Sequence, residues 1–166
     1  MIVFDASTLI LVAKAELLEG FLDSIAQKVA IPVEVERECC RKEKSLDAIV
    51  IAEAIRDSKI AVKRLRTKKL YQRLREDFRL GKGEAEAIAL ALSEKAPLVA
   101  IDDKSGINAC KLLKIPFTTA VDILVRLQEK RLLAREEAKM KLEALERYGR
   151  YKSEIVADAR LQLEGK

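Results

Sequence analysis

The sequence predicts an α/β protein in which helices cover both faces of a central, mostly parallel sheet of four to five strands. Short, wholly apolar runs, typical of strands buried on both faces, alternate with longer segments of helical periodicity. A chain of 166 residues is long enough for one domain with a substantial core, and with only 4% aromatic residues that core must consist mainly of Leu, Ile, Val and Ala. Helical stripes continue after the last apolar run. We therefore expect a three-layer α/β/α domain followed by C-terminal helices.

The first half of the chain is predicted to alternate strands and helices. Residues 2–4 are an apolar run expected to form a buried strand, after which Ser7 or Thr8 can cap a short helix. Pro32 ends the next apolar run, and because proline is favoured at the first helical position, it marks the start of a helix. We expect helices at 17–25, 33–42 and 47–56 and strands at 28–31 and 59–62.

The second half continues the alternation and then becomes wholly helical. Residues 81–83 are expected to form a glycine turn, and Ser153 offers an N-cap for a last helix. That helix would align Ile155, Ala159 and Leu163, and the helix before it Ala138, Leu142 and Leu145. We expect further helices at 67–79, 84–93, 105–113 and 121–130 and strands at 98–101 and 116–118. We accordingly divide the chain into a domain of residues 1–130 and a helical extension, 131–166, packed on that domain or on a partner.

The amino-acid composition limits the catalytic and metal-binding chemistry that this chain can perform. The chain has no histidine, the residue whose unperturbed side chain changes charge near neutral pH, so a catalyst would work mainly with oxygen ligands, which suit Mg²⁺ or Mn²⁺. The three cysteines match neither a disulfide framework nor a zinc spacing, and buried apolar roles are expected for them. No apolar run approaches the roughly 20 residues needed to cross a bilayer, and no signal peptide opens the chain, so a cytoplasmic protein is expected.

Carboxylates follow several of the apolar segments. Asp5 and the pair Asp102-Asp103 end the two clearest strands, and parallel strands would bring them to one edge of the sheet. Helix capping is the alternative role for each, and which of the pair faces a cleft stays open. Glu84 follows the glycine turn, where the helix dipole alone explains an acid. Glu38 has the spacing of a solvated helix surface.

Two further features carry alternative explanations. Thr119 and Asp122 resemble a capping box, which we favour over a role in orienting water. Between Ser58 and Lys82 lie ten basic residues and two acids, whereas the rest of the chain is slightly acidic. Such a stretch suits a polyphosphate partner or a solvated helix face, and spacing alone does not separate these.

Four segments in order resemble the motifs of the PIN-domain family. VFDAST resembles its opening strand with Asp5, IPVEVERE its second element with Glu38, GKGEAEAIALAL its third with Glu84, and VAIDDKSG its fourth with Asp102 or Asp103. The similarity covers roughly residues 1–130, and the C-terminal helices look like the extension of one archaeal and bacterial branch.

The resemblance implies a Mg²⁺- or Mn²⁺-dependent ribonuclease acting on single-stranded RNA, in many members the toxin of a toxin–antitoxin pair. It implies metal ligation by Asp5, Glu84, Asp102 and Asp103, with Glu38 completing the catalytic acids. It also implies an RNA substrate and a small antitoxin partner, and apolar helix stripes suggest a homodimer. The alternative is a non-catalytic or degenerate PIN-fold module that binds RNA or regulates.

Overall fold

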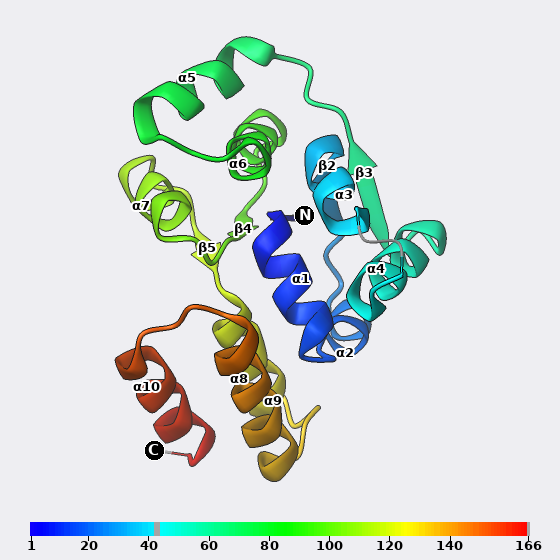
Figure 1. Cartoon of the computed structure of the whole chain (residues 1–166), viewed down its shortest axis with the longest axis vertical. Helices are drawn as coiled ribbons and strands as arrows, with labels where there is room; N and C mark the ends of the chain where they lie inside the picture. The colour runs from blue at the N-terminus through cyan, green and yellow to red at the C-terminus, as the bar shows by residue number, and fades with distance from the viewer. Residues whose placement is uncertain (42–43, 166) are drawn as a thin grey trace.

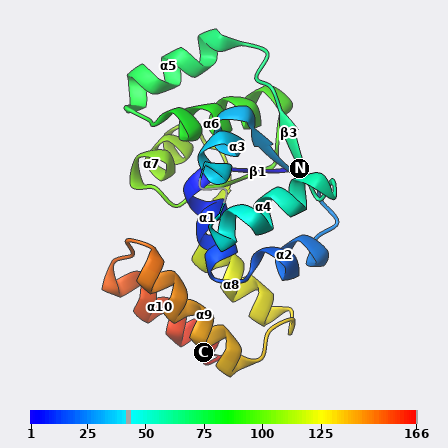
Figure 2. The same ribbon diagram turned by 45° about the vertical axis from the view of Figure 1, so that its right-hand side comes forward.

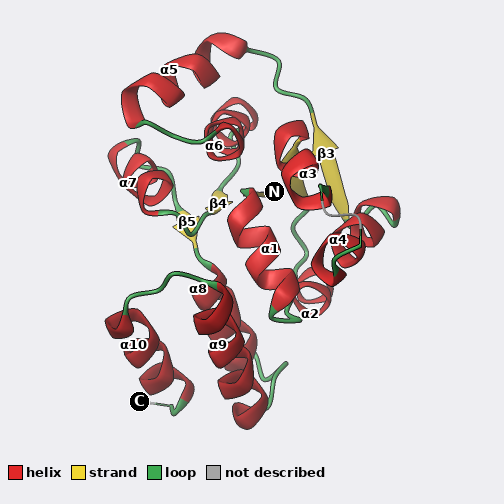
Figure 3. Ribbon diagram, viewed as in Figure 1, coloured by secondary structure: helices red, strands yellow, loops and turns green. Residues whose placement is uncertain are grey.

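Five parallel strands form the central sheet of the computed structural model, which describes residues 1–41 and 44–165. They are β1 (Ile2–Phe4), β2 (Val29–Pro32), β3 (Ile60–Lys63), β4 (Leu98–Ala100) and β5 (Phe117–Thr118). Their order across the sheet is β3-β2-β1-β4-β5, with every neighbouring pair parallel. Figure 3 shows these short strands among the helices that surround them. The predicted α/β class and the parallel sheet are confirmed.

The helices of the described residues follow the predicted alternation closely (Figure 1). A helix follows each strand, as expected of parallel strands joined by crossover connections. The first five are α1 (Ala6–Lys14), α2 (Leu18–Ser24), α3 (Val33–Cys40), α4 (Leu46–Arg56) and α5 (Lys68–Phe78). The others are α6 (Lys82–Glu94), α7 (Lys104–Leu112), α8 (Ala120–Glu129), α9 (Arg135–Tyr148) and α10 (Ser153–Leu163).

Two hydrophobic cores lie on opposite faces of the sheet. Alternate side chains of β1 enter different cores: Ile2 and Phe4 pack with α1, α2 and α8, whereas Val3 packs with α6 and α7. All three are buried, as the uninterrupted apolar run of this strand predicts. Figure 2 shows α5, α6 and α7 to one side of the molecule and α8, α9 and α10 to the other. The result is the predicted three-layer arrangement.

The C-terminal helices extend the first core. Helix α9 packs on α1 and α8, and α10 packs on α8 and α9. The predicted stripe of Ala138, Leu142 and Leu145 is buried against them. In the last helix the prediction for Ile155 was wrong, because this residue is exposed. Val156, the next residue, is buried in its place, together with Ala159 and Leu163.

Several helix starts differ from the predictions. Asp5, not Ser7 or Thr8, caps α1, because its carboxylate accepts the Thr8 amide hydrogen bond. Pro32 belongs to β2 and is the N-cap of α3 rather than its first helical residue. Lys152 precedes α10 where Ser153 was expected.

The glycine turn expected at 81–83 is instead the start of a helix, since α6 begins at Lys82 directly after Gly81. At the other end of the predicted helix 33–42, α3 ends at Cys40, and residue 42 lies outside the described residues. Cys39 and Cys110 are buried as expected, while Cys40 is half-buried. Across the described ranges, no helix combines the length and the apolar character that crossing a membrane requires.

Candidate metal centre at the strand ends

The order of the strands brings Asp5 and Asp102 to the same point. Strand β1 lies between β2 and β4, and chain connections leave it in opposite directions on its two sides, so it borders the point where strand order reverses. Phe4 is in register with Ala100, and the Asp5 amide donates to the Ala100 carbonyl oxygen at 3.0 Å. Asp5 and Asp102 therefore leave neighbouring strands at nearly the same level. Sites of α/β proteins form at such carboxyl edges.

Asp5 is a buried carboxylate held by neutral donors. Only 1% of the residue is exposed. Its Oδ1 accepts the Thr8 amide hydrogen bond at 2.9 Å, and its Oδ2 accepts the Ser7 hydroxyl hydrogen bond at 2.8 Å. Asp5 therefore does cap α1, which is the role proposed above as the alternative to a functional one. A cap needs no burial, however, and burial of a carboxylate without a positive partner is costly.

The electrostatics of Asp5 reflect that cost. Burial raises the pKa of its carboxyl to about 7, against the opposing effect of the hydrogen bonds from Thr8 and Ser7, and the charge of Asp102 adds to the increase. The charge of Asp102 therefore reaches the buried Asp5 carboxyl. Cys39, which is buried nearby and donates weakly to the Ala6 carbonyl oxygen, also senses the Asp5 charge.

Asp102 is oriented by two donors from the C-terminal half of the chain. Its Oδ2 accepts a hydrogen bond from the Ala120 amide, at the start of α8, at 2.9 Å. Its Oδ1 accepts a hydrogen bond from the Tyr151 hydroxyl, in the loop between α9 and α10, at 2.6 Å. Burial raises the pKa of the Asp102 carboxyl, opposed by these two bonds. Sequence reasoning missed Tyr151; its only local signal is an aromatic residue in the predicted interhelical loop of a chain with few aromatics.

Thr8 places a further oxygen between the two acids. The residue is fully buried, and its hydroxyl is close enough to both Asp5 and Asp102 to lower their pKa values. Within the described ranges, however, Thr8 Oγ1 makes no hydrogen bond of normal geometry. A buried polar atom without a partner in a folded protein points to a missing water, ion or ligand.

Asp103 turns away from this pair, which settles the geometry of the two adjacent acids. It is exposed and caps α7, accepting the Ser105 amide hydrogen bond at 2.8 Å and a short one from the Ser105 hydroxyl. Gly106 allows α7 to start this close to β4, because a Cβ there would lie 2.8 Å from Ile101 Cγ1. The helix-capping alternative is therefore observed for Asp103, whereas Asp102 is half-buried and lies next to Asp5.

Glu84 lies near Asp103 rather than near Asp5. Its carboxylate accepts the Gly81 amide hydrogen bond at 3.1 Å, closing the first turn of α6, and lies 3.5 Å from the Ser105 hydroxyl. Burial raises the pKa of the Glu84 carboxyl, and the charges of Asp103 and Glu38 add to the increase. Glu84 thus lies within reach of the charges of both Asp103 and Glu38, and these three acids form a second acidic group.

Glu38 links α3 to α6 and is not merely a solvated surface residue. Its Oε1 accepts the Gly83 amide hydrogen bond at 3.2 Å, and a Cβ at Gly83 would lie only 2.8 Å from that oxygen. Burial raises the pKa of the Glu38 carboxyl, with a smaller contribution from Glu34 and Glu86. Glu86 makes a second link, accepting the Glu34 amide hydrogen bond at 2.8 Å. The two links seat the α6 start against α3.

The donor set suits a hard cation. The site offers the carboxylate oxygens of Asp5 and Asp102 and the hydroxyl oxygen of Thr8. Mg²⁺ commonly binds through one or two carboxylates while keeping several waters. In the part of the chain that the structure describes, no three acids or cysteines are already gathered closely enough to hold an ion between them. Asp5 and Asp102, with the unpartnered Thr8 hydroxyl, fit a cation held partly by water.

A group of exposed basic residues lies on α5 and in the segments that flank it. Of the ten basic residues between 58 and 82, Lys59 pairs with Asp23 at 2.8 Å and Lys63 with Glu94 at 2.6 Å. Helix α5 is anchored on α6 and α7 through its buried Leu74, which leaves its basic face outward. The remaining eight are exposed and form no ion pair with another described residue: Arg64, Arg66, Lys68, Lys69, Arg73, Arg75, Arg79 and Lys82. We call these eight residues the basic surface.

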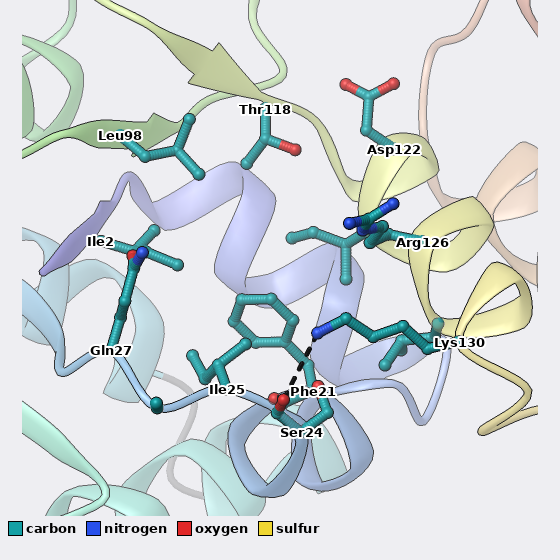
Figure 4. Close-up of a pocket in the computed structure, with 13 residues that line it drawn as sticks. Ile2, Phe21, Ser24, Ile25, Gln27, Leu98, Thr118, Asp122, Arg126 and Lys130 are labelled. Carbon is teal, nitrogen blue, oxygen red and sulfur yellow. Dashed lines mark hydrogen bonds between the residues drawn. The ribbon is translucent and has the colours of Figure 1, made fainter.

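A pocket of about 470 Å³ lies elsewhere (Figure 4). Ile2 and Leu98, at the amino ends of β1 and β4, contribute to it, so it opens away from the acids at the carboxyl ends. Phe21 and Ile25 form apolar walls, and Lys130 reaches across to the Ser24 carbonyl oxygen at 3.4 Å. None of the candidate acids lines it.

A comparison with models of known protein families identifies a family for this chain. The DUF3368 family model, described as a PIN domain, matches residues 1–166. No curated protein and no solved structure matches the chain with statistical significance. PIN domains are generally nucleases that act on RNA and typically use divalent metal ions, so the fold is of a nuclease type. The match extends over the C-terminal helices as well as the sheet, and the chain therefore belongs to the PIN-domain family.

Proposed function

We propose that this protein is a Mg²⁺- or Mn²⁺-dependent endoribonuclease that hydrolyses single-stranded RNA. Asp5 and Asp102 would be the primary metal ligands, and Asp103, Glu84 and Glu38 would complete the catalytic acids directly or through water. The observation that carries the proposal is the buried Asp5 carboxylate together with the half-buried Asp102 carboxylate beside the topological switch point, with no basic side chain hydrogen-bonded to either of them in the described residues.

The energetics of that pair favour a cation. Burial raises the pKa of both carboxyls, and the charge of Asp102 raises that of Asp5 further, so nearby positive charge would stabilise their ionised forms. The donors present on Asp5 and Asp102 are hydroxyls and amides, which orient the oxygens without supplying that charge. A divalent cation would supply it.

The remaining acids suit the handling of water. A bound divalent ion would lower the pKa of a water molecule and stabilise charge at phosphorus. Glu84 and Glu38 both have carboxyl pKa values raised by burial and by neighbouring acids, which makes them better proton acceptors near neutral pH. Because both are tied to the start of α6, they would orient a water from a fixed position.

The basic surface supports the RNA part of the proposal. Its eight cations face solvent instead of neutralising acids of the same chain, and Lys82 lies close enough to Glu38 to lower the pKa of that carboxyl. A polyphosphate strand could thus run along α5 and reach the acids at the start of α6. A single strand bends into such a narrow site more readily than a duplex does.

Cleavage of a labelled single-stranded RNA by the purified protein tests the proposal. We expect cleavage that requires Mg²⁺ or Mn²⁺, stops with chelator and falls by at least about 100-fold in Asp5→Asn and Asp102→Asn. Asp57→Asn is the matched control, since Asp57 is an exposed acid at the end of α4. Equal cleavage by wild type and Asp5→Asn would reject the enzyme. RNA binding without metal-dependent cleavage would instead favour a non-catalytic PIN-fold module.

The proposal includes a toxin role with a small antitoxin as partner, because many members of the PIN-domain family act so. Co-expression with the product of a neighbouring short reading frame should suppress growth inhibition, and co-purification should recover both proteins.

A homodimer is proposed from exposed apolar side chains such as Leu112 and Met140. Light scattering that shows a monomer at high protein concentration would reject the homodimer.

A further inference from the structure

We propose that Tyr151 is a positioning residue of the metal site, so that the loop between α9 and α10 is a working part of that site. The inference rests on the proposed function, since it takes Asp102 as a metal ligand. It goes further in giving the C-terminal helices a role at the site, because they deliver the hydroxyl that orients Asp102.

The two hydrogen bonds on Asp102 fix its carboxylate plane. The Ala120 amide, which belongs to the backbone of α8, holds Oδ2 at 2.9 Å, and the Tyr151 hydroxyl holds Oδ1 at 2.6 Å. A carboxylate has about four lone-pair positions, so each oxygen keeps one for another ligand. Tyr151 therefore leaves room for a cation while preventing the carboxylate from rotating away from Asp5.

The chemistry of the donor suits this positioning role. A phenol is neutral, so it orients Asp102 without cancelling the negative charge that would attract a cation. Lysine or arginine in its place would form an ion pair and compete with the cation. Hydrogen bonds of this kind to a metal-binding carboxylate are typically worth 10- to 100-fold in metal affinity.

The loop is built to place the Tyr151 ring. Gly149 ends α9, and a Cβ at that position would lie 2.8 Å from Tyr151 Cδ2 and 2.9 Å from the Leu145 carbonyl oxygen. Any side chain there would displace the ring. Helix α9 packs on α1, which begins directly after Asp5, and on α8, which begins at Ala120. Helices α1 and α8, which both begin at the site, thus support α9, and the loop after α9 brings Tyr151 back to the site.

Mn²⁺ binding to the full chain, measured by isothermal titration calorimetry without RNA, tests the inference. Tyr151→Phe keeps the ring and removes the hydroxyl, and we expect it to weaken Mn²⁺ binding about 10-fold with an unchanged melting temperature in chelator. Tyr148→Phe is the matched control, because Tyr148 is at the end of α9, 48% exposed, and its hydroxyl has no hydrogen bond to a described residue. It should bind Mn²⁺ as the wild type does.

Gly149→Ala gives a second route, since it displaces the ring but keeps the hydroxyl in the chain, and it should weaken Mn²⁺ binding to a similar extent. Equal affinity of wild type and a folded Tyr151→Phe would overturn the inference while leaving the metal site intact. Tighter binding by Tyr151→Phe would overturn it too, by showing that the phenol competes with the cation. A wild type that binds no Mn²⁺ would reject the proposed metal site itself, and this inference with it.

Discussion

At the residue scale, Asp5 combines two roles that are usually alternatives. It caps α1, as an aspartate before a helix often does, and it is also almost wholly buried beside a second carboxylate. Capping explains the hydrogen bonds but not the burial. A chain selected for stability alone would gain by an uncharged cap such as Asn or Ser at this position, because neither would place a titratable charge in the core.

The pH dependence of stability follows from that conflict. Since the pKa of Asp5 is about 7 in the folded protein and near 3.8 when unfolded, the folded state binds the proton more tightly. In metal-free protein, Asp5 should therefore lower the free energy of unfolding as pH rises from about 4 to about 7. We expect Asp5→Asn to be more stable than wild type at pH 8, by about 1–4 kcal/mol, and nearly equal to it at pH 4.

Urea denaturation in chelator between pH 4 and pH 8 measures this effect. The exposed Asp57→Asn serves as the control and should follow the wild-type curve. If the stability difference between wild type and Asp5→Asn did not change with pH, the buried charge would not be the cause.

At the element scale, α5 shows how one helix serves packing and charge together. Its buried Leu74, with the half-buried Leu70 and Phe78, faces α6 and α7, and its basic side chains face solvent. The sequence predicts this helix correctly, and the spacing of Leu70, Leu74 and Phe78 places all three on one side of it. The helical periodicity does not decide whether the outer face binds RNA, because a solvated face and a phosphate-binding face have the same pattern.

The salt dependence of RNA binding separates the two. Replacing Lys69 and Arg73 with Ala should weaken single-stranded RNA binding and reduce the slope of log K against log salt by roughly 1 to 1.5, since each phosphate contact adds about 0.7. Lys28→Ala/Arg147→Ala removes the same charge from positions outside the basic surface and should leave the slope unchanged. Fluorescence anisotropy in chelator gives both values. Identical slopes would show that the outer face of α5 is merely solvated.

At the scale of the whole molecule, the first core joins the sheet to the C-terminal helices. Leu142 of α9 is buried in the same cluster as Phe4 of β1 and Leu124 of α8. The boundary that we expected after residue 130 therefore crosses a continuous apolar core, and a division of the chain at that point remains a proposal.

The unfolding of core variants tests whether residues 131–166 unfold separately from residues 1–130. Leu142→Ala should cost about 2–5 kcal/mol of unfolding free energy and keep a single transition. Met140→Ala, two positions away on the same helix and 63% exposed, should change stability by less than about 0.5 kcal/mol. Two separate transitions in Leu142→Ala would instead establish an extension that unfolds by itself.

Much of the fold could be predicted because its signals are local. The apolar runs of β1 and β4, the stripe of α5 and the capping box of Thr119 with Asp122 are properties of neighbouring residues. The errors at Pro32 and Ile155 are of one residue. Such boundaries depend on tertiary packing, which decides whether the next turn of a helix has something to contact.

By itself the sequence determined the α/β class, the absence of histidine chemistry and the placing of Asp5 and Asp102 after strands. Only the tertiary structure placed Asp102 next to Asp5 and Asp103 at the cap of α7, set Glu84 and Glu38 against the start of α6, and brought Tyr151 to Asp102 across 49 positions of the chain. The reason is physical: caps and periodicity act over a few residues, whereas the site depends on which strands are neighbours and where the last helices return. Neither of these is a property of any local segment.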